Sequence, residues 1–252
     1  MSVRPESDRL EVDALVVEGL SDCAISRRTG IPRTTVRGWR LNDVRSRASC
    51  GRCHAAAHRF EDVPGPAYAY LLGQYLGDGY LAAHRRGVFC LRIYLDLLHL
   101  NVAETCRTAI MDVLPGTHVT FGAPSSSRMV IVRAYSKQWP CFFPQHGPGR
   151  KHDRSVELVT WQRTVVDRHP EQLVRGLIHS DGWRGTNNVV VAGKRYAYPR
   201  YQFSQVSDDI RRLFTDCLDQ LGVRWRQMKP TEISIARRAD VAALDRFVER
   251  KR

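Results

Sequence analysis

The sequence predicts an α+β protein in which a small all-α unit precedes two pseudo-symmetric αββαββα halves. Two observations support this fold class. The first 45 residues show helical spacing, and from Pro66 onward one order of helical and strand-like segments occurs twice, with a period of about 100 residues. A repeat of that length indicates a pair of similar subdomains and not a solenoid. The expected boundaries are a helical unit at 1–45, a linker at 46–65, and halves at 66–150 and 151–252.

The charge of the chain is unusual, whereas its apolar content is ordinary. Lys and Arg number 39 against 26 Asp and Glu, which gives a net charge of +13. Such an excess favours a polyanionic partner, nucleic acid before membrane, with an inert basic surface as the alternative. No apolar run approaches the ~20 residues that span a bilayer. The charged N-terminus is unlike a signal peptide, and seven scattered cysteines fit a reducing compartment. We therefore expect a cytoplasmic, nucleoid-associated protein.

The first 45 residues contain three helical segments. Leu10, Ala14 and Val17 share one stripe of the first helix. Ser21 caps the second helix, Gly30 ends it, and a proline opens the third. This spacing resembles a helix-turn-helix DNA-binding unit, with a small helical hairpin as the alternative. The resemblance implies that the third helix faces the major groove through Arg33, Thr34, Thr35, Arg37 and Arg40.

The linker carries a spacing that occurs in metal sites. Cys50 and Cys53 form a C-x-x-C pair, which His54 and His58 follow. Two thiolates and an imidazole supply most of a tetrahedral zinc site, so Cys50, Cys53 and His58 are candidate Zn²⁺ ligands. Because no second C-x-x-C is present, a loop with reduced thiols is the alternative.

The two halves are predicted from apolar spacing in helices and partial alternation in strands. In the first half, we expect helices at 66–79, 100–114 and 137–143 and strands at 87–96, 117–122 and 127–136. In the second half, we expect helices at 170–182, 207–221 and 239–250 and strands at 187–193, 200–206, 223–228 and 232–238.

The first helix of each half ends in the same pattern, "LLGQYLGDG" (71–79) and "VRGLIHSDG" (174–182). In each helix two small residues stand four apart, which places them on one face and lets two helix backbones approach closely. These residues are Gly73, Gly77, Gly176 and Ser180. A close-packed pair of helices would bring Asp78 and Asp181 together at their C-terminal ends.

Two adjacent carboxylates at helix C-termini repel each other and the helix dipoles. A divalent cation removes both penalties, and hard oxygen ligands with open water positions favour Mg²⁺. Beside a phosphodiester, such a cation activates water and stabilises the leaving oxygen. Gly79 and Gly182, which follow the two aspartates, suit the left-handed conformation that ends many helices.

Both segments resemble the LAGLIDADG motif of DOD-type homing endonucleases, and the αββαββα order is similar to that family's repeat over residues 66–252. The resemblance implies a saddle of strands along the DNA major groove. It also implies a metal held by Asp78 and Asp181, with Gly77 and Ser180 beside them. The chain would be a monomeric pseudo-dimer that cuts both strands of a long, quasi-palindromic site in double-stranded DNA. Members often use a basic residue near the active site; the candidates are Lys137 and, as weaker choices, Lys229, Arg237 and Arg238.

The strands of the saddle would supply the DNA contacts. Arg224 and Arg226 share one face of a predicted strand, while Trp225 takes the other. Arg and Gln side chains can read guanine and adenine edges, although a solvated face or a phosphate contact is the alternative for any single Arg. The remaining candidates are Arg92, Arg133, Arg195, Arg200 and Gln202.

The second motif departs from the family pattern at three positions. Ser180 replaces the usual Gly or Ala, and Arg175 and His179 place polar groups where this helix is often apolar. Both aspartates are present, which favours a Mg²⁺-dependent DNA endonuclease. The alternative is a transcription regulator that binds DNA without cutting it, because WhiA-type regulators combine a similar saddle with a helix-turn-helix that follows it.

Overall fold

A computed structural model describes residues 5–47, 50–53, 58–123 and 128–251 of the chain. They fall into two compact units, Met1–His58 and Arg59–Arg252. The helices of the smaller unit are α1 (Glu6–Val17), α2 (Asp22–Thr29) and α3 (Arg33–Arg47). In the described part of the chain, no helix is both long and apolar enough to cross a membrane.

The smaller unit packs its helices around a core of five buried residues, Val12, Leu15, Ile25, Ile31 and Val36. As expected, the Ser21 hydroxyl accepts a hydrogen bond from the Ala24 amide at 3.3 Å, and Gly30 ends α2 with a φ of 70°. The predicted stripe of α1 is wrong, because Leu10 and Val17 are 66% and 88% exposed. The tertiary contacts select the neighbouring stripe of Val12 and Leu15.

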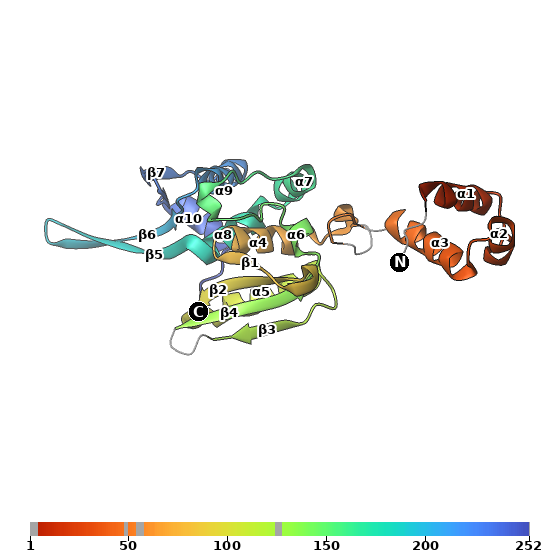
Figure 1. The fold of residues 1–252 in the computed structure, drawn as a ribbon. Helices are drawn as coiled ribbons and strands as arrows, with labels where there is room; N and C mark the ends of the chain where they lie inside the picture. Colours follow the sequence, from red (N-terminus) through yellow and green to blue (C-terminus); the bar gives the residue numbers. More distant parts are fainter. Residues whose placement is uncertain (1–4, 48–49, 54–57, 124–127, 252) are drawn as a thin grey trace. The chain divides into compact units, whose positions relative to one another are not determined.

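The larger unit confirms the predicted fold class, because the order αββαββα occurs twice (Figure 1). The first half contains α4 (Gly65–Leu76), β1 (Gly79–Ala83), β2 (Phe89–Asp96), α5 (Leu100–Val113), β3 (Val119–Gly122), β4 (Met129–Ser136) and α6 (Trp139–Phe142). The second half contains α8 (Pro170–Asp181), β5 (Gly182–Val191), β6 (Lys194–Ser204), α9 (Asp208–Gln220), β7 (Arg226–Lys229), β8 (Glu232–Ile235) and α10 (Arg238–Asp245). Between the halves lies α7 (Thr160–Arg168).

Each half has one four-stranded antiparallel sheet, in the orders β1-β2-β4-β3 and β5-β6-β8-β7. One face of each sheet is apolar and packs into a single core with the helices. Representative buried positions on these inner faces are Leu91, Val132, Phe203 and Ile235. Figure 1 shows α4 and α8 side by side at the centre of the unit, where they pack directly against each other. The outer faces of the sheets carry basic residues such as Arg92 and Arg200, together with exposed aromatic residues such as Tyr80 and Trp183.

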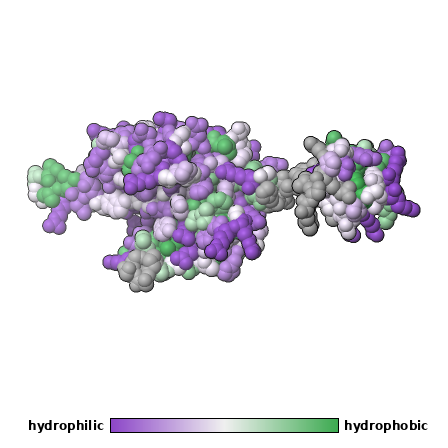
Figure 2. Space-filling model, in the orientation of Figure 1, coloured by the Kyte–Doolittle hydropathy of each residue, from purple (hydrophilic) through white to green (hydrophobic). Residues whose placement is uncertain are grey.

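Four features of the larger unit differ from the expectation. Strand β1 follows α4 so directly that the sequence shows no break between them, and β5 starts at Gly182, five residues before the predicted strand. Helix α7 occupies residues for which neither a helix nor a strand was expected. The β5–β6 hairpin is also longer than β1–β2, and Figure 2 shows apolar residues at its tip, where Val190 and Val191 are 65% and 55% exposed.

Candidate active site

The backbones of α4 and α8 touch at the first pair of small residues. A Cβ atom on Gly176 would lie 2.3 Å from the Tyr70 carbonyl oxygen and 3.0 Å from the Gly73 Cα. A Cβ atom on Gly73 would lie 2.7 Å from the Leu173 carbonyl oxygen. Only glycine fits at either position, so these two residues set the close approach of the helices.

The second pair of small residues brings the two aspartates together. A Cβ atom on Gly77 would lie 2.1 Å from the Ser180 hydroxyl oxygen and 2.8 Å from the Asp181 Oδ2 atom. The Asp181 carboxylate therefore lies against the residue that precedes Asp78, and the charge of Asp78 acts on it directly. Both carboxylates are half-buried at the C-terminal ends of the paired helices.

Gly79 and Gly182 are required for a reason other than the predicted one. Neither has a positive φ, and the φ of Gly182 is −100°. A Cβ atom on Gly79 would lie 2.4 Å from the Tyr75 Cα, and one on Gly182 would lie 2.6 Å from the Ile178 Cα. The expectation of a left-handed conformation is therefore wrong. Glycine is needed instead because the strand leaves the helix end at a point where a side chain would have no space.

Two lysines, which the sequence analysis missed, occupy equivalent positions at the helix ends. The Lys151 ammonium donates to the carbonyl oxygens of Tyr75, Gly77 and Gly79 at 2.5, 2.6 and 2.9 Å. The Lys251 ammonium donates to those of Ser180 and Gly182 at 3.1 and 2.7 Å. Each lysine therefore binds the carbonyls that end one of the two helices, beside the aspartates.

The second motif helix fastens the segment that carries Lys251. His179 is 2% exposed, and its Nε2 atom lies 2.9 Å from the Glu249 carbonyl oxygen. Its Nδ1 atom lies 3.1 Å from the Tyr70 hydroxyl. Because burial lowers the pKa of His179 to about 4, the ring is neutral, Nε2 donates to the carbonyl and Nδ1 accepts from the hydroxyl. Arg175 adds an ion pair with the Glu249 carboxylate at 3.3 Å. Arg175 and His179, the two polar residues that depart from the family pattern, thus position the segment that carries Lys251.

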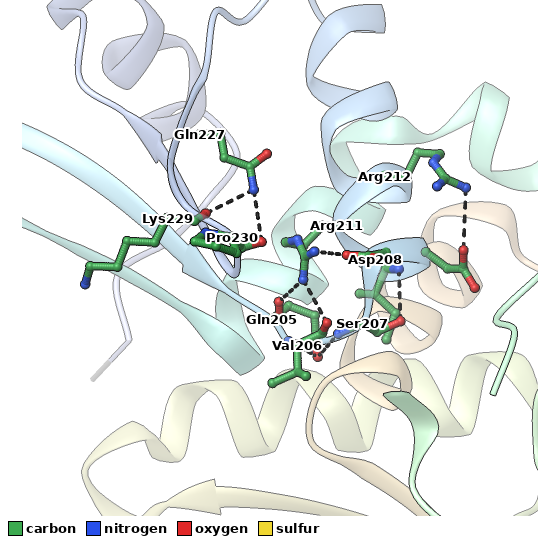
Figure 3. A network of polar contacts seen from close by, with 11 residues as sticks. Gln205, Val206, Ser207, Asp208, Arg211, Arg212, Gln227, Lys229 and Pro230 are labelled. Atoms are coloured by element: carbon green, nitrogen blue, oxygen red, sulfur yellow. Dashed lines mark hydrogen bonds and ion pairs between the residues drawn. The ribbon is translucent and has the colours of Figure 1, made fainter. Parts of the chain in front are cut away.

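Gln205 orients the Asp181 carboxylate from the end of β6. Its side-chain amide donates to Asp181 Oδ2 at 2.8 Å, while its amide oxygen accepts from the Val206 backbone at 2.9 Å. Arg211 holds this turn by donating to the Gln205 and Val206 carbonyl oxygens (Figure 3). In the first half the register places the buried Leu95 at the equivalent position. The two carboxylates therefore differ in their neighbours.

Burial and charge–charge interactions shift the pKa values of the cluster formed by the two aspartates, Asp78 and Asp181, and the two lysines, Lys151 and Lys251. Burial raises the pKa of both carboxyl groups, and with the neighbouring Asp78 charge it raises that of Asp181 to about 7. The two ammonium groups pull both values down. Burial lowers the pKa of Lys151 to about 8, and it also lowers that of Lys251. The four groups are thus coupled, and added positive charge would favour the ionised carboxylates.

The donor set fits a hard divalent cation such as Mg²⁺. Asp78 and Asp181 offer carboxylate oxygens side by side, and burial leaves their repulsion poorly screened. The backbone carbonyls of Gly77 and Ser180 point to the same region, but each accepts a hydrogen bond from a lysine. The carboxylates are therefore the groups that would hold the metal.

Two pockets flank the aspartate pair. One, of about 410 Å³, is lined by Gly77, Tyr80, Lys151 and Asp181 among others. The other, of about 360 Å³, is lined by Gly182, Trp183, Arg250 and Lys251 among others. Tyr80 and Trp183 each stand one residue after the helix-ending glycine, so the pockets are equivalent in the two halves. Each lysine is reached from its own pocket.

Most of the other predicted residues of the larger unit lie on the outer sheet faces. Arg92 pairs with Arg133 across β2 and β4, and Gln202 pairs with Ser234 across β6 and β8. Arg200 faces the same way as Gln202 and lines a pocket with Arg224 and Arg226. Arg195 pairs with Val190 on the opposite face of the hairpin, near its tip.

Several predicted residues have a different environment from the one expected. Lys137 is exposed in the turn after β4, and the lysine charges that act on the aspartates belong to Lys151 and Lys251. Arg224 forms an ion pair with Asp240 at 3.3 Å.

In the smaller unit, the basic surface of α3 is largely exposed, and Thr35 is half-buried. Arg40 donates to Asp22 at 2.9 Å, so this side chain is already paired within the unit. The exposed residues are Arg33, Thr34, Arg37 and Arg40. Of the linker residues named above, His54 lies outside the described residues.

Relative to the Asp181→Asn variant, which keeps the opposing contribution of His179 (pKa about 4), the metal-free protein is expected to lose stability as the pH rises from about 4 to about 7. Over this range folded Asp181, with a pKa of about 7 against an ordinary 3.8, keeps a proton that the unfolded chain has released. A Mg²⁺ ion held by these two residues would need them ionised, so Mg²⁺ should raise the melting temperature more at pH 8 than at pH 6. Calorimetry with Mg²⁺ or EDTA measures the difference. An increase of equal size at both pH values, or one that survives in Asp181→Asn, would contradict the assignment.

Comparison with known proteins gives structural likenesses alone. No family model matches the chain, and no curated protein matches it. The homing endonuclease I-DmoI in complex with DNA and Mn is 14% identical with a TM-score of 0.48, over 73% of this chain and 96% of that one. The LAGLIDADG meganuclease I-AabMI bound to uncleaved DNA is 12% identical with a TM-score of 0.46, over 71% and 82%.

A third solved structure, the N-terminal LAGLIDADG domain of DUF199/WhiA, is 15% identical with a TM-score of 0.45, over 77% of this chain and 87% of that one. Endonucleases and a WhiA domain are thus both among the similar structures, with similar TM-scores. With identities this low and TM-scores below 0.5, none of them decides what this chain does.

Proposed function

We propose that the chain is a metal-dependent endonuclease that cuts both strands of double-stranded DNA at a long, imperfectly symmetric site. One observation carries the proposal: two aspartates meet at the ends of close-packed helices, and each half adds a half-buried lysine at the same position. A purely structural helix contact has no need for four half-buried ionisable groups, whose charges cost free energy to desolvate. Pseudo-equivalent groups in both halves suit the two scissile phosphates of a duplex.

The residues of the site divide the chemistry between them. Asp78 and Asp181 would hold Mg²⁺, which when bound lowers the pKa of a coordinated water and stabilises the leaving oxygen. Gln205 keeps one Asp181 oxygen oriented. Lys151 and Lys251, each at the edge of a pocket, would stabilise the negative charge that develops on a phosphate.

The outer faces of the sheets would receive the DNA. Arg92 and Arg133 lie opposite each other on the outer face of the first sheet. Arg200 and Gln202 lie on the outer face of the second sheet. Together with the net charge of +13, these positions favour a polyanionic duplex. The helices of the smaller unit would add a further DNA contact through the exposed residues of α3.

A second candidate function is DNA binding without cleavage, as in a transcription regulator. The observation in its favour is that both lysines already bind the Gly77 and Ser180 carbonyls and lie near the aspartates. The two ammonium groups offset the negative charge of the carboxylates without a metal. A site of this kind could be stable in a protein that only binds.

Selection from a randomised duplex library separates the two functions. Purified full-length protein is incubated with the library in Mg²⁺ or in Ca²⁺, and bound and cut molecules are sequenced separately. The endonuclease predicts one enriched sequence that is cut on both strands in Mg²⁺. Enrichment of a sequence that stays intact in Mg²⁺ would support the regulator and overturn the endonuclease.

Replacing Lys251 is expected to slow cleavage more than binding. Lys251→Met removes the ammonium while keeping a chain of similar length, so single-turnover cleavage should fall by about 10- to 100-fold, or roughly 1.4–2.7 kcal/mol. Lys137→Met is the matched control, because Lys137 is exposed and was the lysine predicted from the sequence. A larger loss in Lys137→Met than in Lys251→Met would contradict the placement of the catalytic lysines.

A further inference from the structure

Three metal-binding side chains of the smaller unit meet at one point. The Cys53 sulfur lies 3.2 Å from the His58 Nε2 atom. The ligand atoms of Cys50, Cys53 and His58 all lie within 4.8 Å of one another. Tetrahedral bonds to zinc of about 2.0–2.3 Å place ligand atoms roughly 3.3–3.8 Å apart. The cluster therefore needs only a small contraction to surround a zinc ion.

The local chain suits such a site. Gly51–Cys53 forms a turn between the two cysteines, which brings both sulfurs to one side. Cys50 and Cys53 are both reduced thiols, and Cys53 is only 5% exposed. Thiols and imidazole are borderline-soft ligands, unlike the carboxylates of the aspartate pair, so the two sites select different ions.

We infer that Cys50, Cys53 and His58 bind a structural zinc ion, separate from the cation at Asp78 and Asp181. The segment that carries them is rich in small and polar residues, and the five buried residues that form the core of this unit all come from Val12–Val36. Metal bonds supply the order that a small segment lacking its own core cannot obtain from apolar burial. Zinc would thereby fix the C-terminal end of the smaller unit without taking part in cleavage.

Zinc content of the purified full-length protein tests the inference. Protein expressed with added zinc is dialysed, and its metal is measured by plasma mass spectrometry. We expect about one zinc per chain in the wild type and a loss of at least about 80% in both Cys53→Ala and His58→Ala. His58→Cys replaces one ligand by another and should keep the zinc. Cys23→Ser removes an exposed thiol of the same unit and should also keep it.

Cobalt substitution and proteolysis provide readouts beyond zinc content. Co²⁺ in the site should give the charge-transfer absorption of cobalt thiolates and the visible bands of tetrahedral cobalt, in the wild type and in Asp181→Asn alike. Removing the metal should speed tryptic cleavage after Arg52. A wild type that binds neither zinc nor cobalt, a Cys50–Cys53 disulfide in freshly purified protein, or zinc retained in both alanine variants would overturn the inference.

Discussion

Asp78→Asn and Asp181→Asn are each expected to reduce cleavage of the selected duplex by at least about 100-fold, or roughly 2.7 kcal/mol. Each change removes one carboxylate from the pair that would hold the metal, while the amide keeps the shape of the side chain. Binding of the duplex should change by less than about fivefold, because the proposed DNA contacts lie on the sheets. Single-turnover cleavage in Mg²⁺ and binding in Ca²⁺ measure the two quantities.

A surface carboxylate provides the control for this experiment. Asp112, near the end of α5, is exposed, and Asp112→Asn makes the same chemical change away from the helix ends. Its cleavage rate should equal that of the wild type within about twofold. Cleavage that persists at near wild-type rates in both Asp78→Asn and Asp181→Asn would show that the carboxylate pair does not catalyse the reaction.

Gly176→Ala is expected to destabilise the larger unit by about 1–3 kcal/mol, as overpacking a tight contact does. The added methyl group would lie 2.3 Å from the Tyr70 carbonyl oxygen, and backbone cannot move away as a flexible side chain can. The direction of the effect is diagnostic, because alanine in a free helix is more stable than glycine by ~1 kcal/mol. Urea denaturation of the variant measures the change in the free energy of unfolding.

Gly38→Ala is the control variant, because its stability is expected to rise or stay unchanged. Gly38 lies inside α3 without a positive φ, and a Cβ atom there would have no neighbouring group within 4 Å, so alanine should stabilise that helix or leave it unchanged. If Gly176→Ala also increased stability, the backbones of α4 and α8 would not be in the contact that brings Asp78 and Asp181 together.

The sequence predicts the fold because its strongest signals are repeated. The small residues of the two motif helices and the aspartates that follow them stand in one frame, and the structure keeps the order αββαββα in both halves. Shorter elements were missed where local signals are weak. Strand β1 has five residues and no break before it, and α7 is short and mostly polar, so neither stands out before tertiary contacts are known.

The lysines of the candidate site were missed for a geometric reason. Asp78 and Asp181 are 103 residues apart, whereas Lys151 and Lys251 are 100 apart, because loops and strands differ in length between the halves. A fixed offset of 103 therefore pairs Lys137 with Asp240 and misses the true equivalents. The repeated Arg-Lys pairs at 150–151 and 250–251 were a usable signal. Their contact with the helix ends, however, requires the folded chain.

The most direct test of the central claim is to locate Mn²⁺ by anomalous diffraction in crystals of the protein bound to its selected duplex. The claim is that the aspartates at the ends of α4 and α8 hold the metal at the DNA backbone. It predicts an anomalous peak bonded to Asp78 or Asp181 and to a phosphate oxygen, with Lys151 and Lys251 nearby. Mn²⁺ bound elsewhere, or DNA lying away from these two carboxylates, would contradict it.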